Sequence, residues 1–217
     1  MAQANSSGTV DASNAGTITG TAEEIIDAYD DSTITEASDV ALTVDTANSG
    51  TATLTQARSL DGLTTGVVTA TIAATDLSDL VGSSPLLDAN SNNAFTITIG
   101  TADAEITAAN LTSLNGLTTV AIDATNVTQI TGTVAAANTV YTAGDNSEIS
   151  GLGNETVVIS GESSNTLSDA STLNTLDGNT TGTVNAGSLT TIQGALSDVL
   201  TACLLYTSDA ADDVNGV

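Results

Sequence analysis

Acidic side chains are the main candidates for chemistry in this sequence. Adjacent carboxylates occur at Glu23–Glu24, Asp30–Asp31 and Asp212–Asp213, and a pair of carboxyl groups is what glycoside hydrolysis requires. The chain has no His, the commonest general acid or base, and Arg58 is its only basic residue. A polysaccharide lyase would need Arg58 as its basic residue, but we interpret Arg58 as an exposed residue on a helix. Glu23–Glu24 lies in a predicted first helical turn, where acids favour the helix dipole. We therefore predict that the protein is not an enzyme and has no catalytic residue.

One segment carries a metal-binding pattern. SGLGNETVV, Ser150–Val158, resembles one nonapeptide of the calcium-binding parallel β-roll, with Glu155 in place of Asp. Asp145 and Asn146 follow a glycine that lies nine residues before Gly153. Calcium takes about 6–8 oxygen ligands, however, and tandem turns would be needed to supply them. We favour a Gly-rich turn that enters a strand, assign no metal or cofactor residue, and keep calcium as an alternative partner. The lack of His also leaves a zinc site unsupported.

Threonine and aromatic residues suggest two other binding surfaces. The pairs Thr17–Thr19 and Thr96–Thr98 could belong to a flat threonine ladder of the kind that ice-binding solenoids display. They do not recur at one place in every unit, and threonine is ordinary in a half-exposed strand. A glycan site would need aromatic platforms, whereas Tyr29, Tyr141 and Phe95 fit better as core residues.

Composition limits the partners and the shape of the core. The formal net charge is −25 over 217 residues, so the chain lacks the cations that nucleic acids and anionic membrane surfaces require. No apolar run reaches the roughly 18 residues of a membrane span, and the first residues lack the pattern of a signal peptide. Hydrophobic residues make up 40% of the chain but aromatics only 2%. We expect a thin core of small aliphatic side chains, extended by repetition.

Two sequence patterns repeat along the chain. The first reads LDGLTTGVVTA at Leu60–Ala70, LNGLTTVAIDA at Leu114–Ala124 and LDGNTTGTVNA at Leu176–Ala186. The second reads GTITGTAEEIIDAY at Gly16–Tyr29, QITGTVAAANTVY at Gln129–Tyr141 and TIQGALSDVLTAC at Thr191–Cys203. Cys203 therefore stands where the other two copies have Tyr. Predicted strand centres lie roughly 24–36 residues apart, a spacing typical of solenoid repeats.

Each repeat mixes strand and helix patterns. Short β-branched stretches predict strands at GTVDA, ALTVD, GVVTATI, FTITIG, TTVAID, ETVVIS and GTVNAG. A helix is predicted after Thr21, with Glu24 completing a capping box and Ile25, Ile26 and Tyr29 on one face. A second is capped by Ser168 or Asp169, buries Ala170, Leu173 and Leu176, and stops at Gly178. The stretch TADAEITAANLTSLNG predicts a third, with Ile106, Leu111 and Leu114 on its apolar side.

Alternating strands and short helices predict an α/β repeat solenoid with parallel strands. We expect residues 1–202 to form the array, in units of about 1–29, 30–87, 88–141 and 142–202. The alternative is a right-handed parallel β-helix in which the helical stretches are loops. A chain of β-sandwich modules is the third possibility, and the scarcity of hairpin turns argues against it.

These units resemble those of very large, repeat-rich surface or secreted proteins of marine bacteria, cyanobacteria especially. The resemblance rests on stretches such as LSDASTLNTLDGNTTGTVNAG and ISGLGNETVVIS and covers most of residues 1–202. Gly82–Asn90 departs from it, because Pro85 interrupts the helix. The resemblance implies an extracellular or cell-surface location and a structural or adhesive role. A module that binds calcium or glycans is the alternative, and neighbouring copies are further possible partners.

The end of the chain follows a different pattern. CLLYTSDAADD, Cys203–Asp213, matches the translation of the transposase adapter used in short-read sequencing libraries, and Val214–Val217 fit the bases that follow it. We therefore expect residues 203–217 to be a non-biological tail and the remainder to be a fragment of a longer protein. Cys203 then gives no information on redox compartment. The alternative is a degenerate end cap with a buried free Cys.

Overall fold

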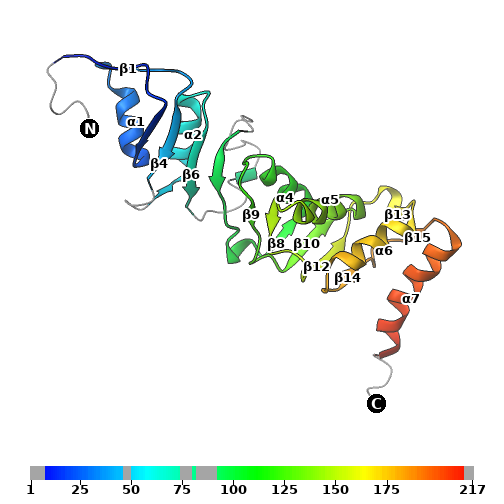
Figure 1. Ribbon diagram of the computed structural model, residues 1–217. Helices are drawn as coiled ribbons and strands as arrows, with labels where there is room; N and C mark the ends of the chain where they lie inside the picture. The colour runs from blue at the N-terminus through cyan, green and yellow to red at the C-terminus, as the bar shows by residue number, and fades with distance from the viewer. Residues whose placement is uncertain (1–7, 46–49, 74–79, 82–91, 213–217) are drawn as a thin grey trace. The chain divides into compact units, whose positions relative to one another are not determined.

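The computed structural model describes residues 8–45, 50–73, 80–81 and 92–212, with side chains through Leu204 (Figure 1). Its chain forms two units whose segments alternate in sequence. The first comprises Met1–Asp103, Ser113–Ala124 and Glu148–Ser150, and the second comprises Ala104–Thr112, Thr125–Ser147 and Gly151–Val217. The four unit boundaries expected from the sequence stay a prediction, as does the tail.

The first unit is built on a five-stranded parallel sheet. Its strands are β2 (Thr17–Gly20), β4 (Ala41–Val44), β6 (Val68–Ile72), β5 (Thr51–Ala52) and β7 (Ala94–Thr96). Strand β4 lies between β2 and β6, while β5 and β7 both pair with β6. Two smaller parallel pairs are β1 (Val10–Ala12) with β3 (Ile34–Glu36), and β9 (Ile122–Asp123) with β11 (Ile149–Ser150). Helices α1 (Ala22–Asp30) and α2 (Leu54–Leu63) pack against each other.

The second unit has the same kind of sheet. Its strands, all parallel, follow the order β8 (Glu105–Thr107), β10 (Gln129–Gly132), β12 (Thr156–Ile159) and β14 (Val184–Asn185). Strand β13 (Thr166–Leu167) pairs with β15 (Thr191–Ile192). Helices α5 (Val134–Asp145), α6 (Ala170–Asn179) and α7 (Leu196–Asp212) pack in succession (Figure 1). Helix α4 (Ala108–Asn115) crosses the boundary between the units.

Small aliphatic side chains fill both cores, as the composition predicts. The residues with no exposed surface include Leu42, Leu60, Val68 and Ile122 in the first unit. In the second unit they include Ile130, Val157, Leu173 and Leu176. Those in strands alternate with more exposed positions, so each sheet is apolar on the side that the helices cover, and the others lie on the apolar faces of the helices.

Side-chain caps explain where the helices begin. Thr21 Oγ1 accepts a hydrogen bond from Glu24 N at 3.2 Å, and Glu24 Oε2 accepts one from Thr21 N at 3.0 Å, which confirms the predicted capping box. Thr53 and Gln56 form the same box at α2. Asp169, rather than Ser168, caps α6.

Two of the predicted helix bounds are wrong. In TADAEITAANLTSLNG the helix begins at Ala108, and Ile106 lies in strand β8 instead. The reason is that Glu105–Thr107 pairs with β10 and Thr107 Oγ1 accepts a hydrogen bond from Asn110 N. Helix α6 runs one residue past Gly178 to Asn179, because that glycine keeps an ordinary backbone conformation.

The fold class is confirmed as α/β with parallel strands. Strands lie in every stretch predicted to hold one, although several are only two or three residues long. Within the described residues all strand pairings are parallel, which argues against sandwich modules built from hairpins. The helices likewise argue against an almost all-β fold.

In the described part of the chain, none of the helices has the length and apolar content to cross a bilayer.

Candidate functional site

The Thr-Thr dipeptide of the first sequence repeat joins segments that are distant in sequence. Thr64 Oγ1 donates to the Val40 carbonyl oxygen at 2.6 Å, Thr118 Oγ1 to that of Phe95 at 2.7 Å, and Thr180 Oγ1 to that of Glu155 at 2.7 Å. These bonds span 24, 23 and 25 residues of sequence. The three hydroxyl-bearing side chains are buried. We call each pair, at 64–65, 118–119 and 180–181, a Thr-Thr bracket.

The second threonine of each bracket reinforces the first. The amides of Thr65, Thr119 and Thr181 donate to the carbonyl oxygens of Ser38, Asn93 and Gly153, each at 2.8 Å. Their hydroxyls donate to the same oxygens at 3.2, 3.1 and 3.2 Å. Each bracket therefore binds the earlier segment at two backbone positions, and its buried hydroxyl also accepts an amide hydrogen from Gly66, Val120 or Gly182.

Two glycines let the backbones approach at these brackets. A Cβ on Gly66 would lie 2.5 Å from the Asp39 carbonyl oxygen and 2.6 Å from that of Val40. A Cβ on Gly182 would collide with the carbonyl group of Glu155. Neither glycine has a positive φ, so the close approach, and not the backbone conformation, is what excludes a side chain here.

Glu155 is the unexpected member of this arrangement. The bracket acceptors Val40, Phe95 and Glu155 are all buried, at 2%, 0% and 0% exposure, and only the last is charged. Its carboxylate accepts hydrogen bonds from Gly153 N at 2.9 Å and from Tyr141 Oη at 3.0 Å. Burial, with a contribution from the Glu155 carboxylate, raises the pKa of Tyr141, so this hydroxyl stays protonated and donates.

This geometry bears directly on the calcium pattern at Ser150–Val158. Glu155, which replaces its Asp, is buried in the fold, whereas Asp145 and Asn146 lie exposed at the end of α5. The structure therefore does not bring these candidate ligands together. Among the described residues, no three His, Cys, Asp or Glu side chains cluster as a metal site requires.

A second buried polar pair was not found from the sequence. Asn93 Nδ2 donates to Asp61 Oδ1, and Asn93 Oδ1 accepts from Val68 N at 3.0 Å. Asn93 and Asp61 are 1% and 6% exposed. Asp61 belongs to the first repeat, where the other copies have Asn115 and Asp177. Because Asp or Asn recurs at this position, the sequence could have indicated a structural role for Asp61. It could not identify the partner, Asn93, which lies 32 residues away.

The other acidic candidates serve local structure. Glu23 and Glu24 are exposed in the first turn of α1, and the hydrogen bonds from Thr21 lower the pKa of Glu24. Asp30 is exposed, and hydrogen bonds from Thr33 lower the pKa of Asp31. Arg58 is exposed on α2. The Asp212 side chain and all of Asp213 lie outside the described structure.

Threonines in the main sheet of the first unit form a short row. Thr19 pairs with Thr43, which pairs with Thr69, but the next partner is Ala94. In the predicted pairs, Thr17, Thr19, Thr96 and Thr98 are exposed. The row is aligned by strand register, which the sequence pattern did not reveal, and it ends after three threonines.

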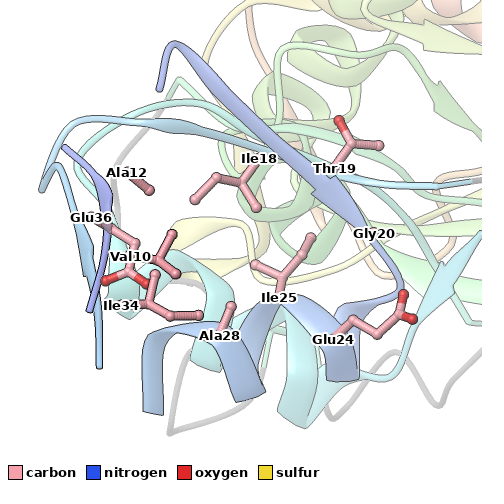
Figure 2. Close-up of a pocket in the computed structure, with 10 residues that line it drawn as sticks. All are labelled: Val10, Ala12, Ile18, Thr19, Gly20, Glu24, Ile25, Ala28, Ile34 and Glu36. Carbon is pink, nitrogen blue, oxygen red and sulfur yellow. The ribbon is translucent and has the colours of Figure 1, made fainter. Parts of the chain in front are cut away.

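An apolar pocket of about 290 Å³ opens in the first unit between α1 and strands β1, β2 and β3 (Figure 2). Its aliphatic lining consists of Val10, Ala12, Ile18, Ile25, Ala28 and Ile34. Figure 2 shows these side chains turned toward a shared space, with Glu24 and Glu36 at its margin. Among the described residues, Glu36 Oε1 and Tyr29 Oη are buried without a hydrogen-bond partner. Burial and nearby Glu36 raise the pKa of Tyr29.

The described aromatic side chains lie in or beside the core, whereas Cys203 is exposed. Phe95 and Tyr141 are buried, which confirms them as core residues, and Tyr29 is half-buried. Cys203 is exposed on α7, which contradicts the alternative of a buried Cys in an end cap.

Comparison of the chain with protein-family models, curated proteins and solved structures gives no match.

Proposed function

We propose that the chain is a structural segment of a large extracellular or cell-surface repeat protein, built as a solenoid and without catalytic activity. A coil, in this proposal, is one helix with the strands that return the chain to the same sheet. Its role is mechanical: stacked coils span distance, and negative surface charge keeps the protein hydrated and dispersed.

The Thr-Thr bracket is the observation that carries the proposal. It occurs at equivalent places in three sequence copies and each time fastens a segment to one that lies 23–25 residues earlier. Together with parallel pairing between successive strands, it supports a fold in which each coil is held mainly by its neighbours. Stability of that kind can be extended by adding coils, as a spacer requires.

The pocket and Glu155 favour a passive structural role over the binding of glycans or calcium. The described lining of the pocket is mainly aliphatic with two acidic residues, and it has neither the aromatic platforms of a glycan site nor a basic group. Glu155, the acid of the calcium pattern, is already engaged inside the fold. A surface or secreted location accords with the charge of −25, which resists aggregation in a salty medium.

Single-molecule force–extension measurement on the chain, tethered at both ends, tests this function. Coils that depend on their neighbours should release one after another. Because about 25 residues extend by at most roughly 3.3–3.6 Å each, each step should lengthen the chain by about 80–90 Å. One event that releases the whole chain would contradict a spacer made of separable coils.

A further inference from the structure

The first sequence repeat places an acid or an amide directly before a glycine in each of its three copies. These dipeptides are Asp61–Gly62, Asn115–Gly116 and Asp177–Gly178. Only the middle copy holds an asparagine, and within the described residues it is the one Asn-Gly dipeptide of the chain. Because glycine has no Cβ, its backbone nitrogen is unhindered. That nitrogen can attack the preceding side-chain amide, which is the first step of spontaneous deamidation.

Local structure sets the middle dipeptide apart from the other two. Gly62 and Gly178 lie inside helices α2 and α6, where the backbone is held in the regular hydrogen-bond pattern of the helix. Helix α4 ends at Asn115, and Gly116 lies exposed in the turn that follows. Helix ends fray, so the backbone at this position can bring the glycine nitrogen to the side-chain amide.

The Asn115 side chain contacts a carboxylate that its deamidated form would repel. Asn115 Nδ2 donates to Glu148 Oε2 at 2.9 Å, across 33 residues of sequence. In the first copy the roles are reversed, because Asp61 is the acid and Asn93, 32 residues later, supplies the amide. Each pair therefore joins one carboxylate to one amide. A carboxylate at position 115 would have no proton to donate to Glu148, and the two like charges would repel.

We propose that Asn115 is a site of spontaneous deamidation whose product loosens the fold around it. The Gly116 nitrogen loses its proton to water and bonds to Asn115 Cγ, the Cγ–Nδ2 bond breaks, and ammonia leaves with a proton from water. A second water opens the succinimide ring. Cleavage between the Gly116 nitrogen and Cγ gives Asp, and cleavage between that nitrogen and the Asn115 carbonyl carbon gives isoaspartate. The net reaction consumes one water, releases one ammonia and adds one negative charge, without oxidation or reduction.

The consequences extend to the nearest Thr-Thr bracket. Leu117 N donates to the Leu114 carbonyl oxygen at 3.0 Å, so a tight turn joins Asn115 to the bracket that begins at Thr118. Isoaspartate inserts one extra carbon into the backbone of this turn. Because Thr118 is buried and donates to the Phe95 carbonyl oxygen, a shift of the turn weakens that hydrogen bond. The proposal is independent of the spacer function.

Timed incubation of the full chain at mildly alkaline pH, followed by peptide mapping with mass spectrometry, tests the modification. Circular dichroism confirms that the chain stays folded. Position 115 should gain about 1 Da and take up oxygen from isotopically labelled water. Its rate should exceed the rates at Asn110 and Asn126 by at least about tenfold, because the leucine and valine that follow those residues hinder the attack. Peptide mapping also separates this change from any at Asn215–Gly216, which lies outside the described residues.

Defined variants test the effect of the product on the fold. Asn115→Asp carries the charge of the product and should lower the urea concentration at the unfolding midpoint, and added salt should recover part of the loss by screening. Asn115→Asp with Glu148→Gln again pairs a carboxylate with an amide, as Asp61 and Asn93 do, and should recover more. Asn185→Asp is the matched control and should leave the midpoint unchanged, because Asn185 is exposed and its side chain already acts as an acceptor.

Ageing of the chain itself supplies the test if Asn115→Asp fails to fold. The aged original chain should unfold at lower urea and exchange its Thr119 amide faster than the fresh chain. Asn115→Gln keeps the amide but would have to close a larger ring, which forms more slowly, so it should keep its midpoint when aged in parallel. The proposal is overturned if Asn115 reacts no faster than Asn126 in the folded chain, or if the aged original chain keeps its midpoint and its exchange rate at Thr119.

Discussion

Thr64 Oγ1 and the Val40 carbonyl oxygen lie 2.6 Å apart, although 24 residues separate them in sequence. Both residues are at least 95% buried, so water cannot replace this hydrogen bond. The same relationship joins Thr118 to Phe95 and Thr180 to Glu155. The Thr-Thr dipeptide, whose residue types are ordinary in loops, therefore joins successive segments through buried hydrogen bonds.

Removal of the bracket hydroxyl should destabilise the fold. Thr64→Val keeps the side-chain shape but removes a buried donor, which should lower the free energy of unfolding by about 1–3 kcal/mol. Thr64→Ser keeps the hydroxyl and should lose less. Thr69→Val, at an exposed strand position, is the control and should change little. Urea unfolding followed by circular dichroism measures all three, and equal effects at Thr64 and Thr69 would refute the role of the bracket.

Two glycines in one repeat should respond in opposite ways to alanine. Gly66→Ala places a Cβ against the Asp39 and Val40 carbonyl oxygens and should cost about 1–3 kcal/mol of stability. Gly62→Ala, four residues earlier in helix α2, meets nothing within 4 Å and should stabilise by about 0.5–1 kcal/mol. Thermal or urea unfolding of the two variants gives the signs. Stabilisation by both would mean that the close approach at Gly66 is absent.

The buried Glu155–Tyr141 pair should behave as a unit. Tyr141→Phe removes a donor to a buried carboxylate and should destabilise by about 1–3 kcal/mol. Glu155→Val introduces the residue found at the equivalent Val40 but leaves the Tyr141 hydroxyl without its acceptor, so it should also destabilise. The double variant removes both polar side chains and leaves only the Gly153 amide without its acceptor, so it should be destabilised by less than the sum of the two single effects. Simple addition of the two single effects in this double-mutant cycle would show that the residues are not coupled.

The caps of α1 and α2 should differ in their response to acid. Hydrogen bonds from Thr21 lower the pKa of Glu24 below its ordinary value of 4.5. The contribution of Glu24 to stability is therefore complete above that ordinary value and is lost as the pH falls through the lowered pKa of the folded state. Glu24→Gln keeps the acceptor and should reduce the loss of stability between about pH 7 and about pH 3.

Helix α2 supplies the reverse control for that experiment. Gln56 makes the same capping contacts with Thr53, so Gln56→Glu should add acid sensitivity where there is none. Unfolding curves at the two pH values give the change in stability for each variant. If neither substitution alters the difference between the two pH values, the capping carboxylate does not act as described.

Repetition and local chemistry made much of the fold predictable. The capping box at Thr21 and the buried face of Ala170, Leu173 and Leu176 follow from helix period and cap residues. Parallel pairing followed from strand and helix alternation, because helical crossovers join parallel strands. The caps and helix faces depend on neighbours within one helical turn, and the alternation of strands and helices is visible along the chain, so the sequence displays both directly.

Features that depend on register were not predictable. Glu155 holds the acidic position of the calcium-like pattern, for which we favoured a Gly-rich turn that enters a strand, yet its position beside the bracket places it in the core with Tyr141. Asn93 finds Asp61 only once β6 and the segment before β7 are aligned. Ile106 was assigned to a helix because its pairing with Ile130 was unknown. In each case a contact more than ten residues away outweighed the local pattern.

Amide hydrogen exchange at Thr65, Thr119 and Thr181 tests the central claim most directly. These three amides lie outside the strands but donate to an earlier segment at 2.8 Å. If the brackets hold successive coils together, all three should exchange as slowly as strand amides such as that of Leu42, and opening should follow the unfolding of their coil. Exchange at the rate of freely solvated amides would contradict the account.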